Sequence, residues 1–215
     1  MEPTAPATAA ASVEATPEAP AAPASLSAVW AQDAGAAVAL GIPDPNTDAI
    51  VVTTSPRGAA IRGVQLIGLN AADAKGPYRF QEPFGGASTD PLATRSISID
   101  GATVDLSEGA WRTEASTDRS VAYAIDIASP RGLVARVRKT FELPDKQAPG
   151  KGYELLIRQQ VENLSAAPIA VKLTVNGPAV PPKESERGPD RQVIAGYSVQ
   201  GDVAAVQYIV ESFQK

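Results

Sequence analysis

Hydrophobic and polar positions alternate along most of the chain from residue 48 onward. The clearest stretch is residues 119–128, where Val121, Tyr123, Ile125 and Ile127 stand at every second position between small or polar residues. A period of two is that of a β-strand with one buried face, because successive side chains of a strand point to opposite sides. No amphipathic helix of useful length is evident after residue 48. The pattern therefore predicts an all-β domain.

The same pattern, interrupted by turn signals, predicts further strands. They cover residues 49–54, 60–69, 96–100, 103–106, 110–114, 119–128, 133–141, 153–163, 169–175, 192–199 and 203–213. Repeated alternation with turns between the strands is typical of an antiparallel sheet and favours a sandwich over an α/β fold. Residues 70–95 are rich in Gly, Pro and Asp and indicate a long loop, for which Tyr78, Phe80 and Phe84 are the expected anchors.

The first 47 residues differ in composition from the rest of the chain. Residues 1–27 consist mainly of Ala, Pro, Thr, Ser and Glu, which bury too little apolar area to offset the cost of ordering the chain. A short, weak helix is expected over residues 27–40, ended by Gly41 and Pro43. The predicted organisation is a disordered linker over residues 1–47 and a β domain over residues 48–215. Because Lys215 follows a predicted strand directly, we expect this domain to be truncated at its C-terminal side.

Composition removes several classes of function. The chain of 215 residues contains no His and no Cys. Ser-His-Asp and Cys-His nucleophile systems, disulfides and the usual zinc sites are therefore excluded. The net charge of −5 argues against a nucleic-acid partner, because phosphate binding needs clustered Lys and Arg. We expect a protein that is not an enzyme and holds no metal or cofactor.

Carboxylate pairs are the remaining candidates for acid–base chemistry. Two carboxyl groups that face each other can hydrolyse a glycosidic bond. The acids that are near in sequence are the pairs Glu114 and Asp118, Asp100 and Asp105, and Glu184 and Glu186. All lie in turn-like or loop stretches, where acids are expected for solvation alone, so we expect no catalytic pair.

A basic cluster, formed by Arg131, Arg136, Arg138 and Lys139, is the other charged feature. Arg136 and Arg138 share one strand face with Thr140. The other face is assigned to Leu133, Ala135 and Val137. This arrangement favours a solvated strand face over an anion-binding site.

No stretch of the chain has the composition of a membrane span. The longest apolar run, residues 34–40, is far short of the roughly 18 residues that a spanning helix needs. The N-terminus also lacks the basic start of a signal peptide, because the first Lys or Arg is Arg57. If the domain is exported, the exporting segment lies outside this chain.

Three stretches resemble a known family when taken in order. The first, within residues 50–69, has the form G-A-x-I-x-x-V-x-L, met by Gly58, Ala59, Ile61, Val64 and Leu66. The second is the strand end K-T-F-E-L at residues 139–143. The third runs from Gly-Tyr-Glu at 152–154 through Val-Glu-Asn at 161–163 to Ala-Pro-Ile at 167–169. Over residues 48–178 the chain is similar to the periplasmic domain of YidC-type bacterial membrane protein insertases.

The resemblance implies a fold, a place and a role. The fold is an antiparallel β-supersandwich related in shape to galactose mutarotase. The place is the periplasmic face of the bacterial inner membrane, to which segments absent from this chain attach the domain. The role is that of a non-catalytic, chaperone-like scaffold in protein transport, with Sec translocon components and nascent membrane proteins as partners. In this family the insertion chemistry lies in a transmembrane bundle, so no catalytic, cofactor or metal residue carries over to this chain.

Other functions fit the same strand pattern. One is a non-catalytic carbohydrate-binding module of the mutarotase-like superfamily, since catalysis there resembles acid–base work by His and Glu. Such a module needs solvent-facing aromatic side chains, for which Trp30 and Trp111 are candidates. A secreted structural β domain is the third alternative.

Overall fold

The computed structural model describes residues 25–33, 35–71, 76–81, 90–147 and 152–179, and the backbone of residues 191–198 and 206–213. Every regular element in this part of the chain is a β-strand, and all paired strands are antiparallel. The all-β prediction is confirmed. No helix in the described ranges is long and apolar enough to cross a membrane.

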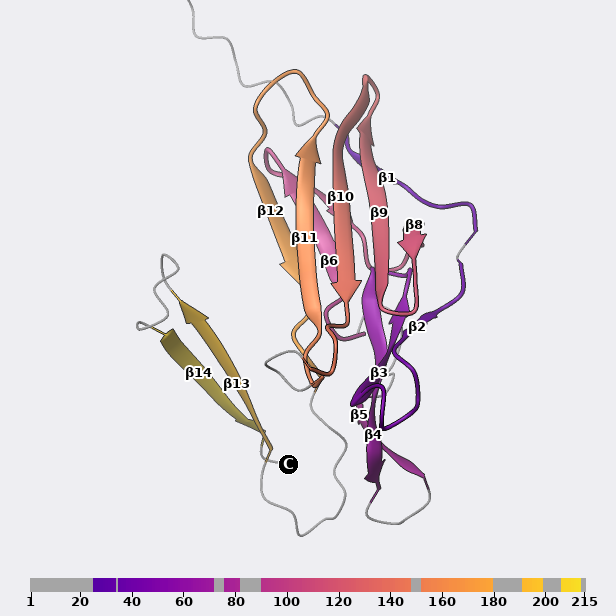
Figure 1. The fold of residues 1–215 in the computed structure, drawn as a ribbon. Helices are drawn as coiled ribbons and strands as arrows, with labels where there is room; N and C mark the ends of the chain where they lie inside the picture. Colours follow the sequence, from indigo (N-terminus) through magenta and orange to yellow (C-terminus); the bar gives the residue numbers. More distant parts are fainter. Residues whose placement is uncertain are drawn as a thin grey trace, which may run out of the picture.

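The largest sheet has five strands (Figure 1). Its order is β1-β9-β10-β11, and β8 also pairs with β9, on the edge that β1 occupies. Its strands are β1 (Ser27–Val29), β8 (Arg112–Ser116), β9 (Ser120–Ser129), β10 (Gly132–Glu142) and β11 (Leu156–Asn163). The β9–β10 hairpin is its spine, and its register sets Val121 opposite Phe141 and Ile125 opposite Val137. The alternation in the sequence thus becomes one buried face on each strand.

Two smaller sheets contribute to the same core. A three-stranded sheet of order β12-β6-β7 is made of β6 (Thr94–Ile99), β7 (Ala102–Asp105) and β12 (Val171–Val175). A four-stranded sheet of order β2-β3-β4-β5 is made of β2 (Val38–Leu40), β3 (Ile50–Ser55), β4 (Ala60–Asn70) and β5 (Pro77–Gln81). A separate hairpin consists of β13 (Arg191–Ser198) and β14 (Val206–Phe213). Figure 1 shows this hairpin standing apart from the other strands.

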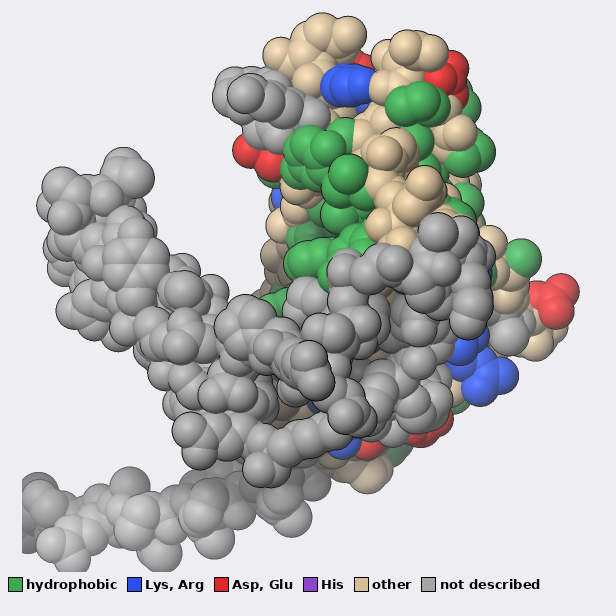
Figure 2. Space-filling view, turned by 90° about the horizontal axis from the view of Figure 1, so that it is seen from below, with side chains coloured by type: hydrophobic (Ala, Val, Ile, Leu, Met, Phe, Trp, Pro, Cys, Tyr) green, Lys and Arg blue, Asp and Glu red, His purple; other side chains and the backbone are tan. Residues whose placement is uncertain are grey.

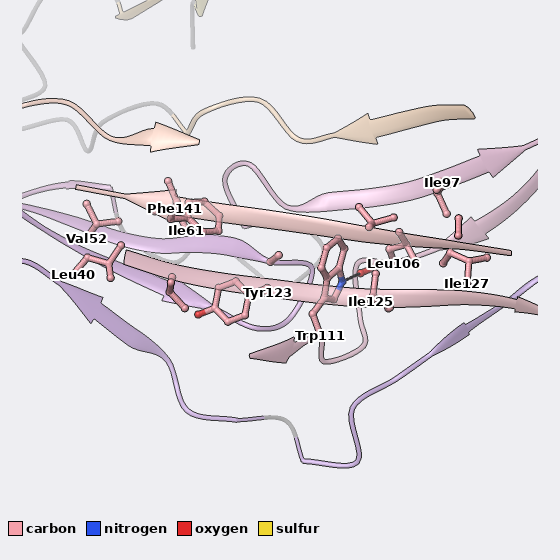
Figure 3. Close-up of a cluster of buried hydrophobic side chains, with 14 of the residues drawn as sticks. Leu40, Val52, Ile61, Ile97, Leu106, Trp111, Tyr123, Ile125, Ile127 and Phe141 are labelled. Atoms are coloured by element: carbon pink, nitrogen blue, oxygen red, sulfur yellow. Dashed lines mark hydrogen bonds between the residues drawn. The ribbon is translucent and has the colours of Figure 1, made fainter. Parts of the chain in front are cut away.

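The core runs the length of β9 and β10 (Figure 3). At one end Phe141 meets Val52 and Ile61 from the four-stranded sheet, and at the other Ile127 lies near Ile97 from the three-stranded sheet. Trp111 fills the middle, where its Nε1 donates a hydrogen bond of 3.3 Å to the carbonyl of Leu106. Both smaller sheets therefore pack against the buried face of the large one, as in a β-sandwich.

The helix predicted over residues 27–40 is wrong, because this segment holds the strands β1 and β2. Alanine-rich sequence favours a helix weakly, and pairing with β9 and β3 overrides that preference. Gly35 adopts a φ of +60° between the two strands, which a helix does not permit. Residues 27–40 therefore belong to the sandwich and not to a linker. Residues 1–24 of the predicted linker lie outside the described ranges.

The long loop predicted over residues 70–95 contains β5 and the start of β6. Of its expected anchors, Phe80 is exposed and Tyr78 is half-buried, while Phe84 lies outside the described residues. The predicted strand at 110–114 is displaced to β8, which begins one residue after Trp111. The remaining strands are confirmed with shifts at their ends, including the β6–β7 hairpin, whose turn places Asp100 and Gly101 at φ values of +49° and +87°.

Candidate functional site

The outer face of the five-stranded sheet carries a network of ion pairs, here called the charged ladder. Arg138 Nε lies 2.6 Å from Glu114 Oε2, and Arg136 Nε lies 2.7 Å from Asp126 Oδ1. Arg112 joins the two pairs, at 3.2 Å from Glu114 and 3.7 Å from Asp126. A second bond from Arg136 Nη2 to Asp126 Oδ2, at 3.2 Å, makes that pair bidentate. The five side chains thus form a continuous, preorganised strip across β8, β9 and β10.

The arginines hold both acids of the ladder in their ionised form. The hydrogen bond from Arg138 lowers the pKa of Glu114, and the bond from Arg136 lowers the pKa of Asp126. A catalytic acid needs the opposite shift, toward neutral pH. A hollow of about 520 Å³ lies beside the ladder, lined by Arg136, Arg138 and the β11 residues Gln160, Val161 and Glu162. The charge and shape of this face suit recognition of a polar partner surface.

The predicted solvated face is confirmed for Arg136 and Arg138, whose neighbours Ala135 and Val137 are buried on the other side. Leu133, assigned to the buried face, is instead 48% exposed. The cause is a register shift between Leu133 and Ala135 in the pairing of β10 with β9, since a bulge turns side chains to the other face.

Lys139 does not belong to the basic cluster, because it points into the core. Its side chain is 1% exposed, and its Nζ donates hydrogen bonds to the Leu92 carbonyl and, at 3.3 Å, to Thr94 Oγ1. Gln159 Nε2 from β11 donates to the same hydroxyl at 3.2 Å. Lys139, Thr94 and Gln159 form what we call the interlayer polar cluster, which joins the two layers between β10, β11 and β6.

Burial lowers the pKa of Lys139 to about 8, because the charged ammonium loses its hydration. The alternation that turns Ala135 and Val137 inward also turns Lys139 inward, so the sequence contained the signal for this position. Nothing in the sequence pattern marked its partner Thr94 on β6.

Of the acid pairs that are close in sequence, the two that the structure describes, Glu114 with Asp118 and Asp100 with Asp105, have no partner in common among the described residues. Asp105 accepts hydrogen bonds from the Ser107 amide at 2.8 Å and hydroxyl at 2.7 Å, which lower the pKa of Asp105. Asp100 accepts a bond of 2.9 Å from the Ala170 amide. Glu114 belongs to the ladder, whereas Asp118 is exposed in the β8–β9 turn. These acids hold turns and strands in place.

Glu184 and Glu186 lie outside the described residues. In the part of the chain that the structure describes, no group of three or more His, Cys, Asp or Glu side chains could hold a metal ion.

A second hollow, which sequence reasoning missed, lies on the four-stranded sheet. It measures about 360 Å³, and its lining includes Arg62, Gln65 and Gln81. Asp90 Oδ2 lies 3.7 Å from Arg62 Nε, and burial raises the pKa of Asp90. Gln81 Oε1 and Asp90 Oδ1 are buried, and neither has a hydrogen-bond partner among the residues that the structure describes. The hollow depends on how β4 pairs with β5, with two register shifts, which one sequence does not reveal.

Comparison with known proteins does not identify the chain. No protein-family model, no curated protein and no solved structure matches it. Function is therefore inferred from the residues and their geometry.

Proposed function

We propose that this chain is the N-terminal part of the periplasmic domain of a YidC-type membrane protein insertase. In this role it is a non-catalytic scaffold that aids the insertion and folding of inner-membrane proteins. The observation that carries the proposal is that each of the three resembling stretches contributes residues with packing or turn-forming roles to one β-sandwich. For the complete domain we propose the β-supersandwich with the shape of galactose mutarotase.

The first stretch forms the turn between β3 and β4. Gly58 has a φ of +62°, and a Cβ at this position would lie 3.2 Å from the Ala93 side chain and 3.3 Å from the Ser107 carbonyl. Ala59, also at positive φ, is fully buried, and Ile61 packs in the core. The spacing G-A-x-I therefore meets a steric need where the turn passes under residues 93 and 107.

The second and third stretches are equally structural. Phe141 and Leu143 from K-T-F-E-L are buried in the core, and the Leu143 amide donates a bond of 2.8 Å to the Arg119 carbonyl. Asn163 organises the turn after β11: its Oδ1 accepts from the Ser165 amide at 2.9 Å and its Nδ2 donates to the Ala167 carbonyl at 2.8 Å. These residues specify the framework of the sandwich, and the function is argued from its surface.

The charged ladder is the surface that we propose for partner proteins. It presents guanidinium groups in fixed positions, and Arg is a residue that protein interfaces favour. Its acids and arginines alternate across the strands, so a partner is recognised by a complementary pattern of both signs. Sec translocon components and nascent membrane proteins are the partners that the resemblance implies.

The carbohydrate-binding alternative loses one of its two tryptophans. Trp111 is buried, and its Nε1 bonds to Leu106. Trp30 is exposed but lies against Gly109, and the exposed Phe80 and Tyr153 come from other parts of the chain. Titration with an oligosaccharide panel, followed by Trp fluorescence, tests this alternative: the absence of a shift at millimolar sugar removes it.

Reading the coding sequence on both sides of this chain tests the insertase proposal. The gene is expected to begin with one apolar segment of membrane-spanning length and to continue after residue 215 into about five more. A stop codon soon after residue 215 contradicts the proposal.

Photo-crosslinking tests the proposed surface in the full gene product in inner membranes. A crosslinker at Thr140, beside Arg138 on the outer face of β10, is expected to trap a translocon subunit or a nascent membrane protein. The same group at Leu69, which is exposed on β4, is the control. Equal trapping at both positions, or none at Thr140, contradicts the assignment of this face.

A further inference from the structure

One flank of the sandwich, between β11 and β12, is open. Val171 on β12 is 39% exposed, although its register partner Ile99 on β6 is 3% exposed. Ile157 on β11 is 37% exposed, whereas its partner Phe141 on β10 is fully buried. Directly opposite residues of an antiparallel pair point to the same side of the sheet. The edge strands therefore turn apolar side chains toward the core side and leave them uncovered.

Val171 is one of the residues that line a hollow between β11 and β12, here called the open flank. It measures about 510 Å³ and is lined by Val161, Asn163, Pro168, Ile169, Val171 and Leu173. Figure 2 shows apolar side chains gathered at the described surface when the molecule is seen from below. Among the described strands, β11 pairs only with β10, and β12 only with β6. Each strand thus has a free edge that can accept another strand.

The open flank lacks a covering element, and the β13–β14 hairpin lacks a layer to pack against. Its two strands pair over eight positions with each other and with no other described strand. A hairpin of two strands is at best marginally stable in water and needs a layer to pack against. Its strands have eight residues each, the same as β11.

The connection between β12 and β13 permits docking. β12 ends at Val175 and β13 begins at Arg191, so fifteen residues, 176–190, join them. Fifteen residues span up to about 50 Å when extended, which exceeds the length of an eight-residue strand. The chain leaves β12 from a fixed point, because the Asn176 amide bonds to the Ala93 carbonyl at 2.8 Å. A tether of this kind gives an effective concentration on the order of millimolar.

We infer that the β13–β14 hairpin docks on the open flank, where β13 pairs with the free edge of β12 and the hairpin covers the exposed apolar side chains of β11 and β12. Strands that follow each other in sequence are neighbours in a sheet about two-thirds of the time. The docked hairpin extends the three-stranded sheet to five strands, in the order β14-β13-β12-β6-β7, opposite the five-stranded sheet. The inference does not depend on the insertase proposal.

Thiol reactivity tests the docking in the full chain, which has no cysteine of its own. Val171→Cys places one thiol on the open flank, and Leu133→Cys is the matched control. These two residues are similarly exposed in the undocked arrangement, at 39% and 48%. If the hairpin docks, Ellman's reagent modifies Val171→Cys at least about tenfold more slowly than Leu133→Cys, because it must wait for local opening. Equal rates overturn the inference.

A variant in which the hairpin cannot form tests whether the hairpin is the element that covers the open flank. Ile194→Pro with Ile209→Pro removes two strand amides and disfavours pairing. This change is expected to restore fast modification of Val171→Cys and to leave Leu133→Cys unchanged. Protection that persists in the broken variant, or that grows with protein concentration, assigns the flank to another segment or to a second copy of the chain and overturns the inference.

Discussion

The two flanks of the same sandwich differ in how they are closed. On the flank beside β9, the strands β1 and β8 cover its edge and Trp111 fills the space between the layers, with 1% of its surface exposed. On the flank beside β11, side chains of the same apolar type lie in register with core residues and remain more than one-third exposed. Strand pattern alone therefore does not bury a side chain. A covering element has to be present, and we infer that the β13–β14 hairpin supplies it on the second flank.

The largest expected contrast comes from truncating one apolar side chain on each flank. Trp111→Ala removes the indole from the closed flank and is expected to lower the free energy of unfolding by about 3–5 kcal/mol. Val171→Ala removes only two methyl groups, which the docked hairpin covers, and is expected to cost about 1–2 kcal/mol. Urea denaturation followed by far-ultraviolet circular dichroism measures both. Equal losses would contradict the difference between the flanks.

Two arginine–carboxylate pairs extend the comparison of buried and exposed positions to charged side chains. Arg119 Nη1 lies 3.0 Å from Asp48 Oδ1, a buried carboxylate that also accepts the Ile42 amide at 2.8 Å. Arg158 on β11 lies 3.1 Å from Glu142, and both side chains are exposed.

Removing these two arginines is expected to have unequal effects. Arg119→Ala leaves Asp48 buried without its cation and is expected to cost about 2–3 kcal/mol, less than for a fully buried pair because Arg119 itself is partly exposed. Arg158→Ala is expected to cost less than about 1 kcal/mol. The same urea titrations measure the two variants. A larger loss of unfolding free energy for Arg158→Ala than for Arg119→Ala would contradict this expectation.

Substitution of Lys139, which lies between the two flanks, is expected to raise the free energy of unfolding, whereas the substitutions above lower it. Lys139→Met keeps most of the buried volume and removes a charge that pairs with no carboxylate in the described ranges. It is therefore expected to stabilise the fold by about 1–2 kcal/mol at pH 7. The loss of the bond to Leu92 limits the gain. Thermal denaturation measures the change, and a destabilised variant would show that the polar bridge outweighs the burial of charge.

The pH dependence of the wild-type chain gives a second test of Lys139. Its pKa is about 8 in the folded state and near 10.5 when unfolded. Between these values the unfolded chain binds more protons, so stability rises with pH, and below pH 8 the full cost of burial is present. The gain from Lys139→Met, measured as the difference between the two chains at each pH, is thus expected to shrink from pH 7 to about pH 9.5. A stability gain of Lys139→Met that does not change with pH would show that the gain does not come from removing the buried charge.

The smallest expected effect concerns one hydrogen bond near the closed flank. Tyr123 Oη lies 2.8 Å from Thr54 Oγ1 in the core, and Thr54 also donates to the Val38 carbonyl at 3.1 Å. Tyr123→Phe keeps the ring and leaves Thr54 with its second partner, so the cost is expected to be about 0.5–1.5 kcal/mol. Denaturant titration resolves a change of this size. A loss above that of Arg119→Ala would mean that the hydroxyl has a role that these contacts do not explain.

The sequence predicted the long strands and missed the features that depend on distant neighbours. Period-two alternation located β9 and β10 because their two faces meet different surroundings. The segment at 27–40 looked helical, since its own residues do not reveal that β1 pairs with the distant β9 and β2 with β3. Two of the ladder arginines, Arg136 and Arg138, were placed on the correct face. Their partners Glu114 and Asp126 were not found, because register across strands cannot be read from one sequence.

A spin label on the open flank tests the central claim most directly. A nitroxide on Val171→Cys, the only thiol in that variant, broadens the nuclear magnetic resonance signals of amides that come close to it. In dilute solutions of the 215-residue chain, the account predicts broadening of amides in residues 191–198 and 206–213, and its loss when Ile194→Pro and Ile209→Pro break the hairpin. Unaffected hairpin amides, or broadening that appears only between molecules, would contradict it.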